Sequence, residues 1–214
     1  MNNLKEYIIE KLKLNKDSGI VKAAYHPQTK EELIKLLHKL VRQRGEDADL
    51  NDIDVSAVTD MSELFSKSLS KKIHNIDISE WDVSHVINMR SMFSHCSNFD
   101  CDLSKWDVHN VIDMQWMFDK CSKFKGKGIE NWEVNNVIHI AGMFSDCLEF
   151  DADLSDWELN KNVESLRSLF YRCYKFTGKG LEKWNISKMN IRYGLGRMFD
   201  GCKSLKNKPS WYHE

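Results

Sequence analysis

The sequence lacks the features that mark membrane-spanning and secreted proteins. It contains no run of about 18 or more apolar residues, so no transmembrane helix is expected. Charged side chains interrupt the N-terminal segment every few positions, unlike the continuous apolar core of a secretory signal. We therefore expect a cytoplasmic protein that does not contact a membrane. A cell-surface protein whose upstream signal has been removed is the alternative.

A surplus of either charge is also missing. The 31 Lys+Arg and 32 Asp+Glu residues give a net charge of -1, whereas a general nucleic-acid binder carries a basic surplus. Hydrophobic residues make up 42% of the chain, which is enough for a core and argues against wholesale disorder. A length of 214 residues fits one domain, or one domain with a small cap.

The common motifs of catalysis and metal binding are absent as well. The cysteines form no C-x-x-C pair, and neither H-E-x-x-H nor G-x-S-x-G occurs. The glycine-rich segments 126–128 and 178–180 do not match the phosphate-binding loop, so we interpret them as turns. The acidic turns 100–102 and 151–153 lack the EF-hand pattern, and a weak calcium site there stays open. We expect a non-enzymatic protein with no catalytic residue, cofactor or metal ligand.

Tryptophan and cysteine, by contrast, are frequent and regularly spaced. Five of the six cysteines recur at spacings of 25 to 29 residues. Six tryptophans recur at spacings of 25 to 27 residues: Trp81, Trp106, Trp132, Trp157, Trp184 and Trp211. Periods of this length indicate stacked repeat units, each too small to bury its apolar face alone. We therefore predict that the first five of these tryptophans and the five cysteines form core ladders, one rung per unit, and that Trp211 closes the stack.

The units predict a domain organisation and a fold class. We assign residues 1–48 to a helical N-terminal segment and cap, and residues 49–214 to about six repeats. The repeats start near residues 50, 78, 103, 129, 154 and 181, and Ile53 takes the tryptophan position of the first. Apolar residues recur at spacings of three and four after a short alternating stretch, which favours short helical turns after a short strand. The predicted fold is an α/β leucine-rich-repeat-like solenoid with an α-helical N-terminal cap.

The N-terminal segment predicts two helices. Residues 4–14 are amphipathic, and Thr29 with Glu32 forms a capping-box pattern before a second helix over about 30–44. Gly45 provides the stop signal for this helix. We expect the second helix to cover the open end of the solenoid; a partner-binding helix is the alternative.

Acidic turns alternate with basic, glycine-containing turns between the units. If the units stack in order, Lys127 and Lys179 lie beside acidic turns, and we predict a ladder of charge pairs along one edge. The extra residue of each glycine-containing turn predicts positive φ angles there.

The repeat resembles the BspA-like bacterial surface-protein repeat family. The clearest match is Trp81-Asp82-Val83-Ser84-His85-Val86 with Met89 and Met92-Phe93; the stretch from Thr29 to Val55 is similar to the lead-in common in that family. The resemblance covers about residues 26–205. It implies a leucine-rich-repeat-like solenoid of the kind that mostly binds proteins. The missing signal and anchor favour an intracellular binder, or an inhibitor of a partner protein of phage or mobile-element type.

Three aromatic residues break the repeat consensus. Trp116 stands where other units have Ser91, Gly142 and Ser168, so we predict that this position is exposed. Tyr171 and Tyr174 replace mainly serine. Exposed aromatic residues are favoured in protein-binding sites, although scattered surface aromatics are the alternative. We predict that Trp116, Tyr171 and Tyr174 bind another protein, with the chain itself a monomer. A surface adhesin domain is the second hypothesis, and an enzyme with a site between units is the third.

Overall fold

The second predicted helix is present as α2 (Lys30–Arg44) in the computed structural model, which describes residues 23–66, 68–189, 191 and 194–213. The Thr29 hydroxyl accepts a hydrogen bond from the Glu32 amide, as the capping pattern predicted. Gly45 ends the helix with a φ of 92°, and its amide donates to the Val41 carbonyl. The helix predicted over 4–14 lies outside the described residues.

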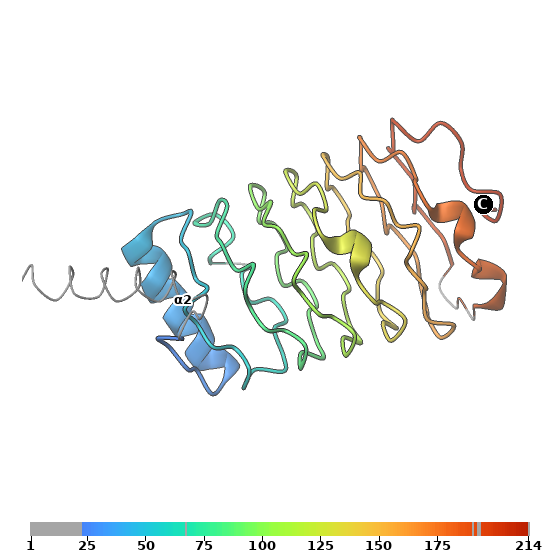
Figure 1. Cartoon of the computed structure of the whole chain (residues 1–214). Coiled ribbons are helices and arrows are strands. Elements are labelled where there is room, and N and C mark those ends of the chain that lie inside the picture. The colour runs from blue at the N-terminus through green and yellow to red at the C-terminus, as the bar shows by residue number, and fades with distance from the viewer. Residues whose placement is uncertain (1–22, 67, 190, 192–193, 214) are drawn as a thin grey trace, which may run out of the picture.

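The rest of the described chain forms a stack of irregular coils, one coil for each sequence repeat, with α2 at one end of the stack (Figure 1). Three short 3₁₀ helices interrupt the coils: η1 (Ile129–Asn131), η2 (Leu181–Lys183) and η3 (Ile186–Lys188). The side chain of Arg44 in α2 donates two hydrogen bonds of 2.7 Å to the carboxylate of Asp52. This ion pair joins the helix to the first coil. The proposed division at residue 48 stays a prediction.

Aromatic rings form the core of the stack. The ring centre of Phe93 lies 5.2 Å from that of Phe65 and 5.5 Å from that of Phe118, with interplanar angles of 7° and 4°. The same stacking continues through Phe144, Phe170 and Phe199. The predicted tryptophan rungs are confirmed, because the five from Trp81 to Trp184 are at most 4% exposed. In these five and in Trp211, the indole N–H donates to a carbonyl of the preceding coil, at 2.7 to 3.3 Å.

The predicted cysteine rungs are confirmed in the same way. The thiols of four successive coils are fully buried, and a fifth, Cys202, is half-buried at the end of the stack. The Cys147 thiol donates to the Phe118 carbonyl over 3.0 Å, and the Cys121 thiol donates to the Phe93 carbonyl over the same distance. A buried thiol thus acts here as a small apolar side chain with one weak donor.

The predicted α/β fold class is wrong. Among the described residues there is no strand, only five isolated parallel bridges, and α2 is the single α-helix. The spacing of three that suggested helical turns comes from successive single turns, such as the Met92 amide donating to the Met89 carbonyl and the Cys96 amide to the Phe93 carbonyl. A helical turn and a β-turn both bring residues i and i+3 together, so the apolar pattern alone does not separate them.

Left-handed residues explain why the bridges do not extend into strands. Each coil contains one at the position held by Ser91, with φ of 53°, and most contain a second at the position held by His95, with φ of 68°. A positive φ interrupts extended backbone, so neighbouring coils pair through single hydrogen bonds between turns. The amide of Ser91, for example, donates to the carbonyl of Gln115 in the next coil, over 2.9 Å.

The turns between coils behave as the sequence predicted at several positions. Gly128 and Gly180 have φ of 92° and 86°, and a Cβ on either would lie 2.2 Å from a backbone nitrogen of the neighbouring coil. Lys127 forms an ion pair of 2.8 Å with Asp102, which confirms the predicted charge pairing at that turn. Hydrogen bonds from Ser155 lower the pKa of Asp153, and the ammonium group of Lys179 lowers it further by a smaller amount.

Candidate partner-binding surface

Trp116 lies against the backbone of the next coil rather than projecting into solvent. The residue is half-buried and has a φ of 58°, the left-handed conformation of its position in the repeat. A Cβ on Gly142 would lie only 2.1 Å from two carbons of the indole ring. The glycine that suggested an exposed position is therefore the residue that leaves room for the Trp116 ring.

Tyr171 and Tyr174 lie at the other end of the stack, close to one guanidinium group. Arg172 donates hydrogen bonds of 3.0 and 3.3 Å to the Tyr174 hydroxyl and forms an ion pair of 3.1 Å with Asp146 in the preceding coil. The pKa of Arg172 is raised, first by the hydrogen bond with Tyr174 and next by Asp146, while Tyr171 adds a smaller electrostatic effect.

Two further cations stack on the tyrosine rings. The Arg197 guanidinium lies 4.3 Å from the centre of the Tyr171 ring, and the Lys203 ammonium lies 4.1 Å from the centre of the Tyr174 ring. Both distances are within the range of cation–π attraction. Tyr171, Arg172, Tyr174, Arg197 and Lys203 together form what we call the basic–aromatic cluster.

The structure thus brings two of the three predicted residues together and leaves the third apart. Tyr171 and Tyr174 share the neighbourhood of Arg172, whereas the contact found for Trp116 is with Gly142, two coils from Arg197 along the stack. The aromatic residues that break the repeat consensus do not by themselves reveal the three cations of the cluster. Two of these cations could have been found from the sequence, because Arg197 follows Tyr171 by 26 residues and Lys203 follows Tyr174 by 29 residues, about one repeat in each case.

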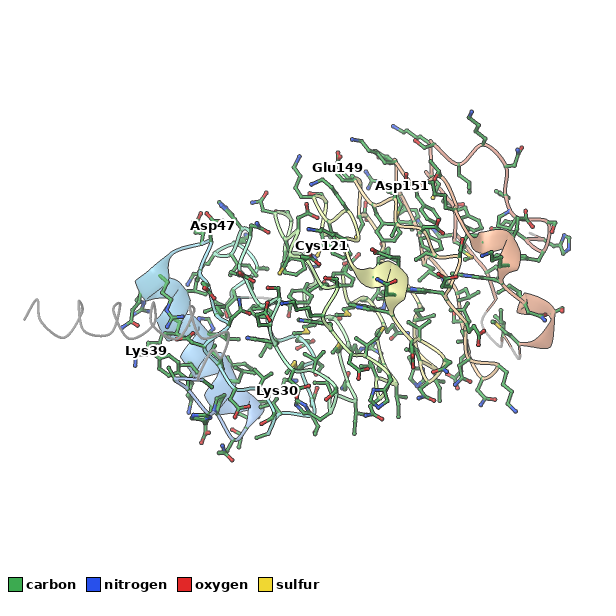
Figure 2. The ribbon with its side chains drawn as sticks, viewed as in Figure 1. Lys30, Lys39, Asp47, Cys121, Glu149 and Asp151 are labelled. Carbon is green, nitrogen blue, oxygen red and sulfur yellow. The ribbon has the colours of Figure 1, made fainter. Side chains whose placement is uncertain are left out.

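The cysteine thiols lie in the core or at its edge. Burial raises the pKa of the Cys121, Cys147 and Cys173 thiols well above the ordinary value. Burial also raises the pKa of Cys101 to about 11 and that of Cys202 to about 12. Thiols in this state are poor nucleophiles. Figure 2 shows Cys121 in the middle of the stack, with Glu149 and Asp151 at one edge.

Two surface depressions lie away from the predicted residues. One, of about 320 Å³, is lined by residues 104–109, Asn131 and Glu133; another, of about 270 Å³, lies between α2 and Leu69. Within the part of the chain that the structure describes, no three His, Cys, Asp or Glu side chains are grouped so that they could hold a metal ion. No helix among those residues is long and apolar enough to cross a membrane.

The stack of coils and its surface cluster define a repeat protein. The family model described as "Mycoplasma protein of unknown function, DUF285" matches residues 35–128 and 103–212, and the chain belongs to this family. The match fits a bacterial surface-repeat family at a coarse level, whereas the narrower BspA-like resemblance stays a prediction. No curated protein and no solved structure matches the chain.

Proposed function

We propose that this protein is a non-enzymatic module that binds another protein through side chains presented on the stacked coils. The observation that supports the proposal is the basic–aromatic cluster. Its Arg172 guanidinium is held between Asp146 of the preceding coil and Tyr174 of its own coil, and the base of the Arg172 side chain lies against Gly201 of the next coil. Tyrosine and arginine are enriched in binding hot spots, and side chains fixed before binding lose less conformational entropy when a partner docks.

The rigid core beneath the cluster supports the same function. Cys173 and Phe170, which flank Arg172 and Tyr171, are both fully buried. The amides of Phe170 and Arg172 donate to carbonyls of the following coil at 3.1 and 2.7 Å. A surface built on such a core keeps its shape in the unbound state. The binding of a partner, with inhibition or sequestration as its result, follows from steric coverage and needs no catalytic group.

The test is the triple variant W116A/Y171A/Y174A. A partner is first captured by cross-linking in the organism that encodes the chain, and its affinity for purified wild-type and variant protein is then measured by calorimetry. We expect the variant to bind at least about tenfold more weakly, as truncation of one or two hot-spot residues does. The control is I87A/I112A, which removes two exposed isoleucines, 47% and 41% exposed, from earlier coils.

The outcome of this comparison distinguishes binding at a specific site from non-specific binding to the exposed apolar surface. Equal affinity of the triple variant and wild type, with both folded by circular dichroism, would remove the proposed site. A loss of affinity in the isoleucine variant alone would move the site to the first half of the stack.

A cell-surface adhesin is the second candidate, and the family match and the BspA-like resemblance favour it. Under this hypothesis the same surface binds a protein outside the cell. Protease treatment of intact cells distinguishes the two locations: a surface protein is degraded, whereas an intracellular one persists until the cells are lysed. The cytoplasmic prediction from the N-terminal segment fails if degradation precedes lysis.

A further inference from the structure

Basic residues are concentrated in the last quarter of this nearly neutral chain. Residues 161–214 contain 12 Lys+Arg and 4 Asp+Glu, whereas residues 1–160 contain 19 Lys+Arg and 28 Asp+Glu. The net charges of the two parts are therefore +8 and -9. Because the coils stack in sequence order, the charges of the described residues are also separated in space, with an acidic body and a basic end (Figure 1). The basic–aromatic cluster lies at that basic end.

The charges of the cluster are only partly neutralised within the protein. Arg172 is paired with Asp146, but the Arg197 contact with Asp200 is long, at 3.7 Å, and the Arg197 side chain is 53% exposed. Of the residues that the structure describes, none forms an ion pair with Lys203, whose ammonium instead lies over the Tyr174 ring. Arg197 and Lys203 therefore retain donors for an external anion.

Resting on the proposed function, we propose that the basic–aromatic cluster binds an acidic polypeptide segment of the partner. Carboxylates match the fork of donors on Arg197 and the ammonium of Lys203 in charge and in hydrogen-bonding capacity. The tyrosine rings hold both cations in place through cation–π contacts at 4.3 and 4.1 Å, so little side-chain entropy is lost when a carboxylate arrives. Charge complementarity also accelerates the encounter with an acidic segment.

The same geometry disfavours a nucleic acid as the ligand. Single-stranded nucleic acids bind by stacking bases on open aromatic faces, and here cations already cover one face of Tyr171 and of Tyr174. A polyanion that extends along the stack also leaves the basic end and meets the acidic body, because acidic residues outnumber basic ones over residues 1–160. The net basic charge lies in residues 161–214, which fits a short acidic segment rather than a long phosphate backbone.

The test measures binding of a fluorescein-labelled peptide of twelve Glu and Asp residues to the full chain by fluorescence anisotropy. We expect saturable binding that weakens as salt is raised, and a loss of at least about tenfold in R197E/K203E. The matched control is K179E/K183E, which makes the same change in net charge at exposed positions of the same part of the stack. This control is expected to bind within about twofold of wild type.

A second variant and a second probe keep the proposal refutable. Y171L/Y174L retains every charge but removes the rings that hold the cations, and we expect it to weaken peptide binding several-fold. Absence of peptide binding, equal losses in both charge-reversal variants, or unchanged binding by Y171L/Y174L would each overturn the proposal. Tighter binding of a fifteen-nucleotide uridine RNA than of the peptide would overturn it in favour of nucleic acid.

These results are independent of the test of the proposed function. If the captured partner loses affinity for the triple aromatic variant but the acidic peptide does not bind, the interaction module stands and the acidic ligand is refuted. If the peptide binds as expected but the captured partner binds the triple variant as tightly as wild type, the cluster stands as an acidic-peptide site and the proposed interface is refuted.

Discussion

The contact between Trp116 and Gly142 yields the sharpest prediction about the stack. Replacing Gly142 with serine introduces the residue found at this position in other coils, Ser91 and Ser168, which adopt φ of 53° and 56°. The position itself therefore accepts serine, and the left-handed backbone does not exclude the substitution. The obstacle is the indole of Trp116, which a Cβ on Gly142 would approach to 2.1 Å.

The ring has to move, because the backbone of Gly142 is held by the next coil. The Gly142 amide donates to the Arg167 carbonyl over 3.0 Å, and Gly142 accepts a turn hydrogen bond from the Ser145 amide at the same distance. Displacing a packed ring by more than an ångström costs about 1–3 kcal/mol, the range for overpacking. For a chain of this size, a loss of about 2 kcal/mol lowers the melting temperature by roughly 4–8 °C.

A double-mutant cycle measured by urea denaturation and thermal melting tests this reasoning. We expect G142S to destabilise the wild type by about 1–2 kcal/mol more than it destabilises a W116S background, in which only the strain of a serine with positive φ remains. The control G194S places a serine at a glycine with φ of 71° and no atom within 4 Å of its Cβ, so its cost should not depend on Trp116. Equal costs of G142S in both backgrounds would refute the explanation.

Two further predictions follow from the core ladders. The unfolded thiols ionise near pH 8.5, whereas burial keeps the folded thiols protonated to higher pH. The contribution of the thiols to the free energy of unfolding should therefore be constant below pH 8.5 and fall above it by about 1.4 kcal/mol per pH unit for each buried thiol. C147A should reduce this alkaline slope by the contribution of one thiol. If urea titrations between pH 8 and 10 give the same slope for C147A and wild type, the Cys147 thiol is not the buried, protonated group described here. W157F removes the 2.8 Å indole hydrogen bond to the Ile129 carbonyl and part of the ring, so we expect a loss of about 2–3 kcal/mol in urea denaturation. W211F, at the half-buried last rung, should cost less, and equal losses would show that burial does not control the effect.

The sequence by itself determined the period of the repeat and the residues that fill the core. In the central units tryptophan and cysteine recur once and phenylalanine twice, because each coil must bury the same apolar positions against its neighbours. The bounds of α2 were also readable, since Thr29 and Gly45 act locally through backbone hydrogen bonds. Both kinds of signal depend on residue type and spacing alone.

Only the tertiary structure decided how the backbone runs and which surface residues meet. Spacing of three suits a helical turn and a β-turn equally, and the left-handed residues that select the β-turns here are mostly not glycine, so the pattern predicted the wrong fold class. The positions of Trp116 over Gly142 and of Arg172 between Asp146 and Tyr174 depend on the register between coils. That register is set by the hydrogen bonds and ring contacts of the whole stack, which join residues about one repeat apart.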